Sequence, residues 1–252
     1  MVREFNQGFR HPTGSTPYKV TVSVPMADIP PEGFPVLYVL DGNAYGTMSR
    51  EMLKLQWRRS DKTQVDATVI VSIGYETTEV FPSTRVLDFT PPASAVSLPP
   101  KPDGTPWPAH GGAEEFLHFI EKEVLPFVFK SASINADRQT LFGHSLGGLF
   151  VLYTLFNRPD LFQNYISCSP SIWWNECQIL KEEQRKCLPD GKNLFIAAEK
   201  GDKQNMYDNA LHLYERLRTD SPSIMFRSPE GENHMSIVPA ILSEAIRFFH
   251  GK

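Results

Sequence analysis

The sequence has few of the features that mark exported, membrane-spanning or nucleic-acid-binding proteins. Its 252 residues include only three cysteines, and their spacing fits no zinc site, so we expect reduced thiols and a cytoplasmic protein. The formal net charge of −4 offers no excess of basic residues to bind nucleic acid or acidic membranes. The longest strongly apolar run, 149–156, is too short to cross a bilayer, and residues 1–6 contain no apolar export signal. These absences leave an ordinary globular protein, for which we expect a small-molecule partner.

Strand-like and helix-like apolar segments alternate along the chain. Strands are predicted at 18–24, 36–40, 68–73, 140–142, 165–168, 193–197 and 223–226. Helices are predicted at 114–129, 149–156, 206–217 and 237–249, of which 149–156 is apolar almost all round. Alternation of this kind with apolar strands predicts a mostly parallel sheet covered by helices on both faces. The length is that of one domain, so we expect a single α/β domain over residues 1–252.

The segment 82–112 breaks this alternation, because it has little periodicity and carries eight prolines. It follows the predicted strand that ends at Ile73. In an open α/β sheet, loops at the carboxyl ends of strands line the ligand crevice. We therefore expect an insertion loop that forms a wall or lid near the active site. The alternative is an excursion over the surface without a role in the site.

The segment Gly143 to Gly148 reads Gly-His-Ser-Leu-Gly-Gly and matches the G-x-S-x-G pattern of a nucleophile elbow. It lies between a predicted strand and a predicted helix, which is the context the pattern requires. The elbow exposes the hydroxyl of Ser145, and the glycines allow strand and helix to approach closely. The free N–H groups of the following helix face any negative charge that forms at Ser145. Elbow and alternation together predict the α/β-hydrolase fold, with a sheet of about eight strands.

A serine nucleophile needs a histidine base and a carboxylate to hold it, and in this fold their chain order is Ser, acid, His. Three histidines follow the serine. His212 lies within a helical stripe, His250 is two residues from the end, and His234 lies on a polar turn before the last helix, so His234 is the predicted base. The acid should follow the strand at 193–197, where Glu199 and Asp202 are the candidates. We favour Asp202, which follows a turn glycine, and keep Glu199 as the alternative.

The tetrahedral intermediate of acyl transfer requires an oxyanion hole. One donor is expected from the backbone N–H of Leu146, the residue after the nucleophile. The second is expected from the loop after the strand at 36–40, where we predict the backbone N–H of Asn43. These two groups and Ser145 would lie at one edge of the sheet.

Five segments together resemble the enterochelin esterase-like esterases, a branch of the α/β-hydrolases that includes trilactone siderophore esterases. The segments are Leu37 to Ala44, Thr84 to Pro91, Gly111 to Phe116, Gly143 to Gly148 and Ser169 to Asn175. The resemblance extends over about the whole chain. It implies an α/β-hydrolase fold and ester hydrolysis without a cofactor or metal ion.

By this resemblance Ser145 is the nucleophile, His234 the base, and Asp202 falls where relatives place an acidic residue after the seventh strand. Many relatives have Gly-Glu-x-Glu there, whereas this chain reads Glu199-Lys200-Gly201-Asp202, which leaves the acid open.

Three further residues are candidates for substrate binding. Arg85 matches an arginine that resembles a substrate-binding residue of the siderophore esterases, although it could instead pair with Asp88. Trp173 and Trp174 could stack on aromatic rings of a substrate, or pack under the proline-rich segment.

The residues predict the reaction better than the substrate. The first hypothesis is a serine esterase that cleaves a siderophore-type trilactone through an acyl-enzyme. The second is a general carboxylesterase for small acyl or aryl esters, and transfer of the acyl group to an acceptor other than water is a variant of the same chemistry. A non-catalytic binding protein is the third, and the intact Ser145, His234 and carboxylate argue against it.

Overall fold

The computed structural model describes residues 1–13, 16–101, 103–183, 190–201, 204–218 and 223–250. In these residues eight strands form one sheet in the order β1-β2-β4-β3-β5-β6-β7-β8. The strands are β1 (Val2–Phe9), β2 (Tyr18–Pro25), β3 (Phe34–Val39), β4 (Val69–Tyr75), β5 (Ile134–His144), β6 (Asn164–Cys168), β7 (Asn193–Ala197) and β8 (Ile224–Arg227). β2 is antiparallel to both β1 and β4, and all other pairs are parallel. The prediction of a mostly parallel sheet of about eight strands is confirmed.

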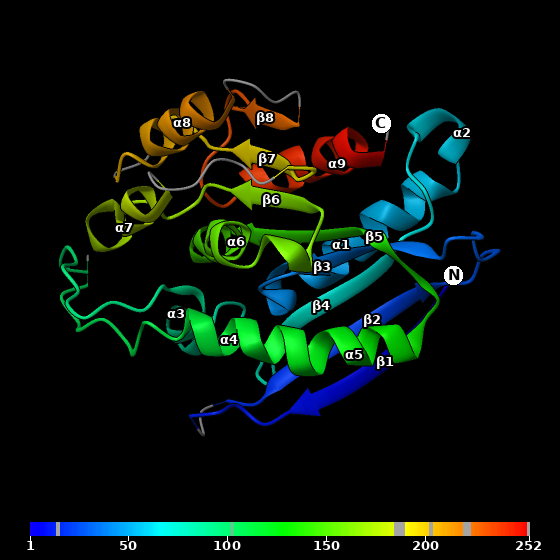
Figure 1. The fold of residues 1–252 in the computed structure, drawn as a ribbon, viewed down its shortest axis with the longest axis horizontal. Coiled ribbons are helices and arrows are strands. Elements are labelled where there is room, and N and C mark those ends of the chain that lie inside the picture. The colour runs from blue at the N-terminus through cyan, green and yellow to red at the C-terminus, as the bar shows by residue number, and fades with distance from the viewer. Residues whose placement is uncertain (14–15, 102, 184–189, 202–203, 219–222, 251–252) are drawn as a thin grey trace.

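Helices connect the parallel strands and cover both faces of the sheet (Figure 1). They are α1 (Gly42–Trp57), α2 (Ser60–Thr63), α3 (Thr84–Phe89), α4 (Ala113–Phe119), α5 (Leu125–Ser131), α6 (Leu146–Asn157), α7 (Trp174–Glu183), α8 (Met206–Leu217) and α9 (Ile237–His250), together with a π-helical turn, η1 (Ile120–Val124), and a 3-10 turn, η2 (Pro159–Leu161).

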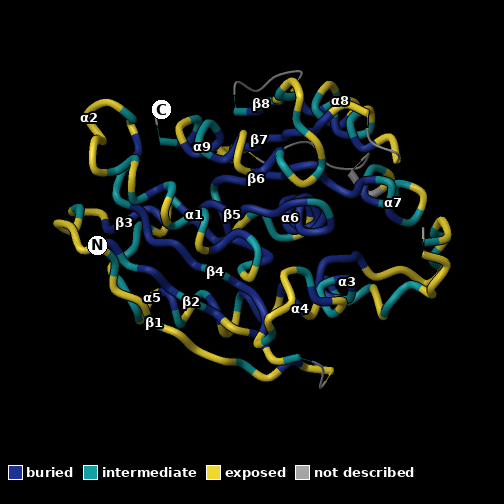
Figure 2. The backbone as a smooth tube through the Cα atoms, turned by 180° about the vertical axis from the view of Figure 1, so that it is seen from behind, coloured by how far each residue is buried: buried dark blue, intermediate teal, exposed yellow. Residues whose placement is uncertain are grey.

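Alternate side chains of the central strands are buried in two separate hydrophobic cores, one on each face of the sheet. Val36 and Tyr38 of β3 belong to a core that also contains residues of α4, α5, α6 and α8, whereas Leu37 and Val39 belong to a core with residues of α1 and α9. This follows from the two-residue period of a strand, which sends successive side chains to opposite faces. The central strands are buried on both faces, while β1 at the edge is largely exposed (Figure 2). Residues 146–156 of α6 are all buried, as their apolar sequence predicts.

Several elements were not predicted. The helix α1 lacks an apolar stripe because it packs closely on β4 through small residues: a Cβ on Gly42 or Gly46 would press on Ile73 or Ser72. Strand β1 has mostly exposed residues, as expected for an edge strand, so no alternation marks it. The expectation that 82–112 is irregular throughout is wrong for α3, a short helix at its start. Tertiary contacts stabilise α3, and they leave no periodic pattern in the sequence.

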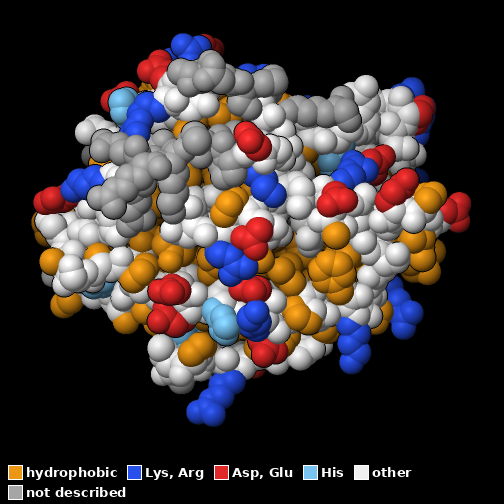
Figure 3. Space-filling model, in the orientation of Figure 1, with side chains coloured by type: hydrophobic (Ala, Val, Ile, Leu, Met, Phe, Trp, Pro, Cys, Tyr) orange, Lys and Arg blue, Asp and Glu red, His pale blue; other side chains and the backbone are white. Residues whose placement is uncertain are grey.

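The described helices include none long and apolar enough to span a membrane. On the face of the molecule that Figure 3 presents, acidic and basic side chains are interspersed with apolar ones. This mixture agrees with the small net charge of the sequence.

Candidate active site

Ser145 occupies a sharp turn between β5 and α6, with φ 59° and ψ −118°. An L-residue rarely adopts this conformation, and strained backbone of this kind clusters at active sites. The close approach of strand and helix explains two of the motif's glycines. A Cβ on Gly143 would collide with the carbonyl of Gly147, and one on Gly148 would lie 2.8 Å from the carbonyl oxygen of Cys168. The predicted nucleophile elbow is therefore present in its expected geometry.

The carboxyl ends of four neighbouring strands bring the candidate groups together (Figure 1). Ser145 follows β5, Ser171 follows β6, Glu199 follows β7, and His234 lies between β8 and α9. All four line one pocket of about 480 Å³, to which Trp173 also contributes. This is the edge of an open α/β sheet at which ligands bind. In this structure the hydroxyl of Ser145 lies 3.3 Å from that of Ser171.

A buried carboxylate holds the imidazole of His234. Nδ1 lies 2.8 Å from Oε1 of Glu199, whose side chain is 3% exposed, and the Ser169 hydroxyl donates to the other carboxylate oxygen. Burial alone would raise the pKa of Glu199, but the hydrogen bonds from His234 and Ser169 outweigh it and lower the pKa to about 2. An ionised carboxylate only accepts hydrogen bonds, so Nδ1 of His234 carries the proton. Nε2 is then the nitrogen that can accept a proton from a nucleophile.

Of the two acid candidates, only Glu199 lies within the described residues. Glu199, the alternative of the two, is the partner of His234. Asp202, the favoured candidate, lies outside the described residues. The argument for Asp202 was the neighbouring turn, and Gly201 does have a positive φ of 85°. The long side chain of Glu199 reaches the imidazole from directly after β7.

His144, the variable residue of the motif, was not predicted to matter. Its ring lies behind that of His234, with 4.4 Å between ring centroids, and the Tyr45 hydroxyl lies 2.9 Å from its Nδ1. Burial, reinforced by the nearby charges of His234 and Arg85, lowers the pKa of His144 to about 3. The candidate base therefore packs against a buried imidazole ring that is neutral.

The two predicted oxyanion donors lie at the starts of helices. Leu146 is the first residue of α6, and Asn43 is in the first turn of α1, where backbone N–H groups have no acceptor within the helix. The carbonyl of Asp41 accepts hydrogen bonds from the N–H groups of Ala44 and Tyr45, but not from Asn43.

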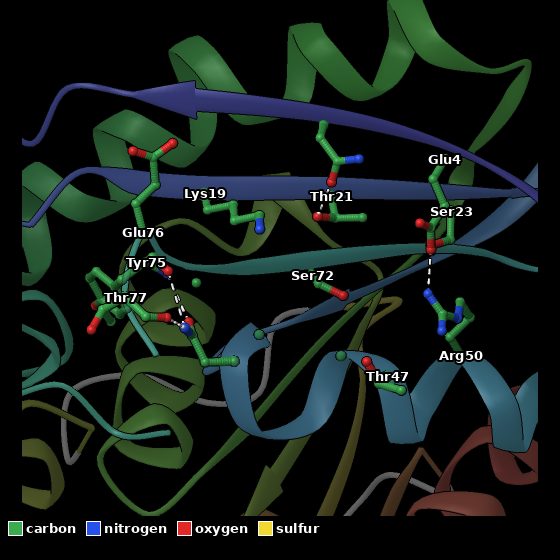
Figure 4. Close-up of a pocket in the computed structure, with 15 residues that line it drawn as sticks. Glu4, Lys19, Thr21, Ser23, Thr47, Arg50, Ser72, Tyr75, Glu76 and Thr77 are labelled. Atoms are coloured by element: carbon green, nitrogen blue, oxygen red, sulfur yellow. Dashed lines mark hydrogen bonds and ion pairs between the residues drawn. The ribbon is translucent and has the colours of Figure 1, made fainter. Parts of the chain in front are cut away.

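The side chain of Asn43 is held by the end of β4 and the segment after it. Its amide bonds to the backbone of Tyr75 and Thr77 at one end of a second cleft of about 750 Å³ (Figure 4). Polar groups that pair with one another line this cleft, including Glu4 with Arg50. None of the four candidate groups of the Ser145 pocket lines it.

Arg85 and Asp88, one turn apart on α3, have different partners. Arg85 donates to both carboxylate oxygens of Asp41, from Nε at 2.6 Å and from Nη2 at 2.8 Å. The alternative that Arg85 pairs with Asp88 is therefore wrong. Asp88 instead accepts hydrogen bonds from Tyr18, Tyr75 and the imidazole of His11.

The two tryptophans of the predicted binding set lie in different environments. Trp173 lines the pocket, whereas Trp174 is 1% exposed. Trp174 packs against Trp107 and His110, at ring-centroid distances of 5.3 Å and 5.8 Å. Trp107 also lies 5.9 Å from Trp173, so the proline-rich segment reaches the residues of the pocket wall. Among the residues that the structure describes, no cluster of three His, Cys, Asp or Glu side chains could hold a metal ion.

Comparison with known proteins agrees with this geometry. The family model described as Putative esterase matches residues 13–216. The chain is 46% identical to the ferri-bacillibactin esterase BesA of Bacillus subtilis over 243 residues, 92% of this chain and 84% of the relative. It superposes on the crystal structure of the BES protein from Bacillus cereus with a TM-score of 0.87 and 38% identity, covering 98% of this chain and 95% of the other. The siderophore hydrolase EstA from Aspergillus nidulans gives a TM-score of 0.83 at 29% identity, covering 98% and 94%.

Proposed function

The chain belongs to the putative esterase family, and we propose that it cleaves the ester bonds of a trilactone siderophore through an acyl-enzyme on Ser145. The observation that carries the proposal is the pocket itself. A serine on a strained elbow and a histidine anchored by a buried carboxylate line the same cavity. This is the arrangement that nucleophilic acyl transfer requires.

The catalytic steps follow from the positions of these groups. Ser145 attacks the ester carbonyl while Nε2 of His234 takes the hydroxyl proton, and Glu199 stabilises the imidazolium that forms. The backbone N–H groups of Leu146 and Asn43 stabilise the oxyanion. His234 then protonates the leaving alcohol. Water attacks the acyl-enzyme by the same route in reverse and releases the acid.

The substrate class is supported by the relatives and by one wall of the pocket. The names of the relatives describe a ferri-bacillibactin esterase and siderophore hydrolases. Trp173 provides an aromatic surface beside Ser145, suited to stacking on the rings of a catecholate substrate. Hydrolysis of the ester backbone would lower the affinity of such a ligand for iron. The iron is then part of the substrate, not a cofactor of the enzyme.

The test compares a cyclic trilactone siderophore, iron-loaded and iron-free, with p-nitrophenyl acetate and butyrate. We expect kcat/KM for the trilactone to be at least about a hundredfold higher, which corresponds to about 2.7 kcal/mol of additional transition-state binding. Ser145→Ala should abolish hydrolysis of all four substrates. Turnover of the short esters alone would indicate a general carboxylesterase, and unchanged activity in Ser145→Ala would contradict the proposed nucleophile.

A further inference from the structure

Asp41 forms the turn between β3 and α1, directly before the N–H groups of Gly42 and Asn43. Its backbone is left-handed, with φ 50° and ψ 50°, and its side chain is 1% exposed. An aspartate before the first turn of a helix ordinarily accepts hydrogen bonds from the free N–H groups of that turn. In this protein the carboxylate of Asp41 makes no such bond to α1. The first N–H groups of the helix are thus not capped by the side chain of Asp41.

Arg85 holds that carboxylate instead. Its guanidinium donates to both oxygens of Asp41 in the parallel geometry that is the strongest form of this pair. The rings of Phe81 and Phe89 lie 5.4 Å and 5.2 Å from the guanidinium carbon, and the arginine side chain is 11% exposed. Both charges are therefore held in one position and largely out of contact with water.

The helix that carries Arg85 is itself anchored. On α3, Asp88 accepts hydrogen bonds from the hydroxyls of Tyr18 and Tyr75, and from Nε2 of His11 at 3.0 Å. The hydroxyl of Thr90, directly after α3, donates to the carbonyl of Val86. With α3 held in this way, the guanidinium has little freedom to leave Asp41.

The carboxylate of Asp41 also lies against the first turn of α6, which begins directly after the nucleophile. A Cβ on Gly147, two residues after Ser145, would be 3.4 Å from its Oδ2. An unpaired negative charge at this place would repel the oxyanion of the tetrahedral intermediate. It would also compete with that oxyanion for the N–H groups of α1.

We infer that Arg85 is a positioning residue, which draws Asp41 away from the N–H groups of Gly42 and Asn43 and neutralises its charge, so that the oxyanion can use them. The inference rests on the proposed esterase mechanism and differs from a direct contact between Arg85 and substrate. Arg85 is not among the described residues that line the Ser145 pocket. The two roles predict different kinetics, because an uncharged short ester offers nothing for a substrate-binding arginine to recognise.

The test measures kcat and KM of Arg85→Gln on p-nitrophenyl acetate. We expect kcat to fall about a hundredfold with KM within threefold of wild type, since only the transition state needs the oxyanion hole. The inhibition constant of a trifluoromethyl ketone, whose adduct on serine carries an oxyanion, should rise by a similar factor. The second variant is Arg85→Lys, which keeps the charge but not the paired hydrogen bonds, and it should lose about tenfold in kcat.

The decisive variant combines Arg85→Gln with Asp41→Asn. Removing the unpaired charge of the Asp41 carboxylate should raise kcat at least about tenfold over that of Arg85→Gln alone. Simple loss of folding would not give this rescue. Arg158→Gln is the matched control, because Arg158 makes the same two-bond contact to Asp160 on the surface. Its kcat should stay within twofold of wild type.

Two results would overturn the inference. One is an unchanged kcat on the neutral ester in both Arg85 variants, with KM raised only for charged substrates. The other is the absence of rescue in the double variant. Labelling of wild-type Ser145 by a fluorophosphonate separates these outcomes from failure of the proposed function, because an unlabelled serine would reject the esterase mechanism itself.

Discussion

Among the described residues, two histidines are paired with a buried carboxylate, and only one of these pairs lies in the candidate active site. Glu199 and His234 are 2.8 Å apart, and Asp88 and His11 are 3.0 Å apart. Both carboxylates are shielded from solvent and also accept hydrogen bonds from hydroxyl groups. By residue type and distance alone the two pairs are nearly equivalent.

The second ring nitrogen distinguishes them. His11 is 2% exposed, and its Nδ1 accepts hydrogen bonds from the backbone N–H and the hydroxyl of Thr13. His234 is 36% exposed, its proton lies on Nδ1 toward Glu199, and its ring lines the pocket that contains Ser145. The lesson is that a carboxylate–histidine pair can act as a base only when the opposite nitrogen is left free for a nucleophile. The His11 pair, with both nitrogens occupied, serves to hold α3 in place.

The largest expected effect concerns the acid of the first pair. Glu199→Gln should lower kcat about a thousandfold, or about 4 kcal/mol, because an amide neither stabilises the imidazolium nor enforces its tautomer. Steady-state hydrolysis of p-nitrophenyl acetate measures the change. Asp202→Asn is the matched control and should leave kcat within threefold. A larger loss in Asp202→Asn than in Glu199→Gln would make Asp202 the acid.

The second pair should affect stability more than activity. Asp88→Asn removes the charge that His11, Tyr18 and Tyr75 surround, and we expect the free energy of unfolding to fall by about 3 kcal/mol. Urea denaturation followed by circular dichroism measures this loss, and kcat should change less than tenfold. Glu199→Gln should show the reverse pattern. If Asp88→Asn abolished catalysis at unchanged stability, the functional contrast between the two pairs would be wrong.

The smallest effect is the pH dependence that Glu199 contributes to stability. Its pKa is lowered from 4.5 to about 2 in the folded protein, so between these values the unfolded chain binds more protons. The stabilisation is therefore present above pH 4.5 and is lost progressively as the pH falls toward 2. The free energy of unfolding of Glu199→Gln, measured over the same range, should depend less steeply on pH than that of wild type. Equal slopes would show that Glu199 does not titrate with a lowered pKa.

Much of the fold could be predicted because its central strands are continuous apolar runs, which become buried in any arrangement of the chain. The strands β3, β4, β6 and β7 fall within about two residues of the predicted ranges. The helix α1 was missed because its buried face consists of Gly46, Ser49, Tyr45 and Leu53 instead of an apolar stripe. The helix α3 was missed because buried polar side chains stabilise it, and these look like ordinary surface charges in a sequence.

The sequence by itself determined the nucleophile elbow. Its geometry depends on residues within one turn, where Gly143 permits a close approach to the carbonyl of Gly147 that a Cβ would block. The candidate base could also be predicted, since the order of elements leaves one histidine on a loop at the correct edge of the sheet.

Only the tertiary structure decided how the charged groups pair. Glu199 is 35 residues from His234, and Arg85 is 44 residues from Asp41. The nearer acidic neighbour of Arg85 in the chain, Asp88, has other partners. Electrostatic pairing depends on distance in space and on burial, and neither quantity is encoded in the spacing of residues along the chain.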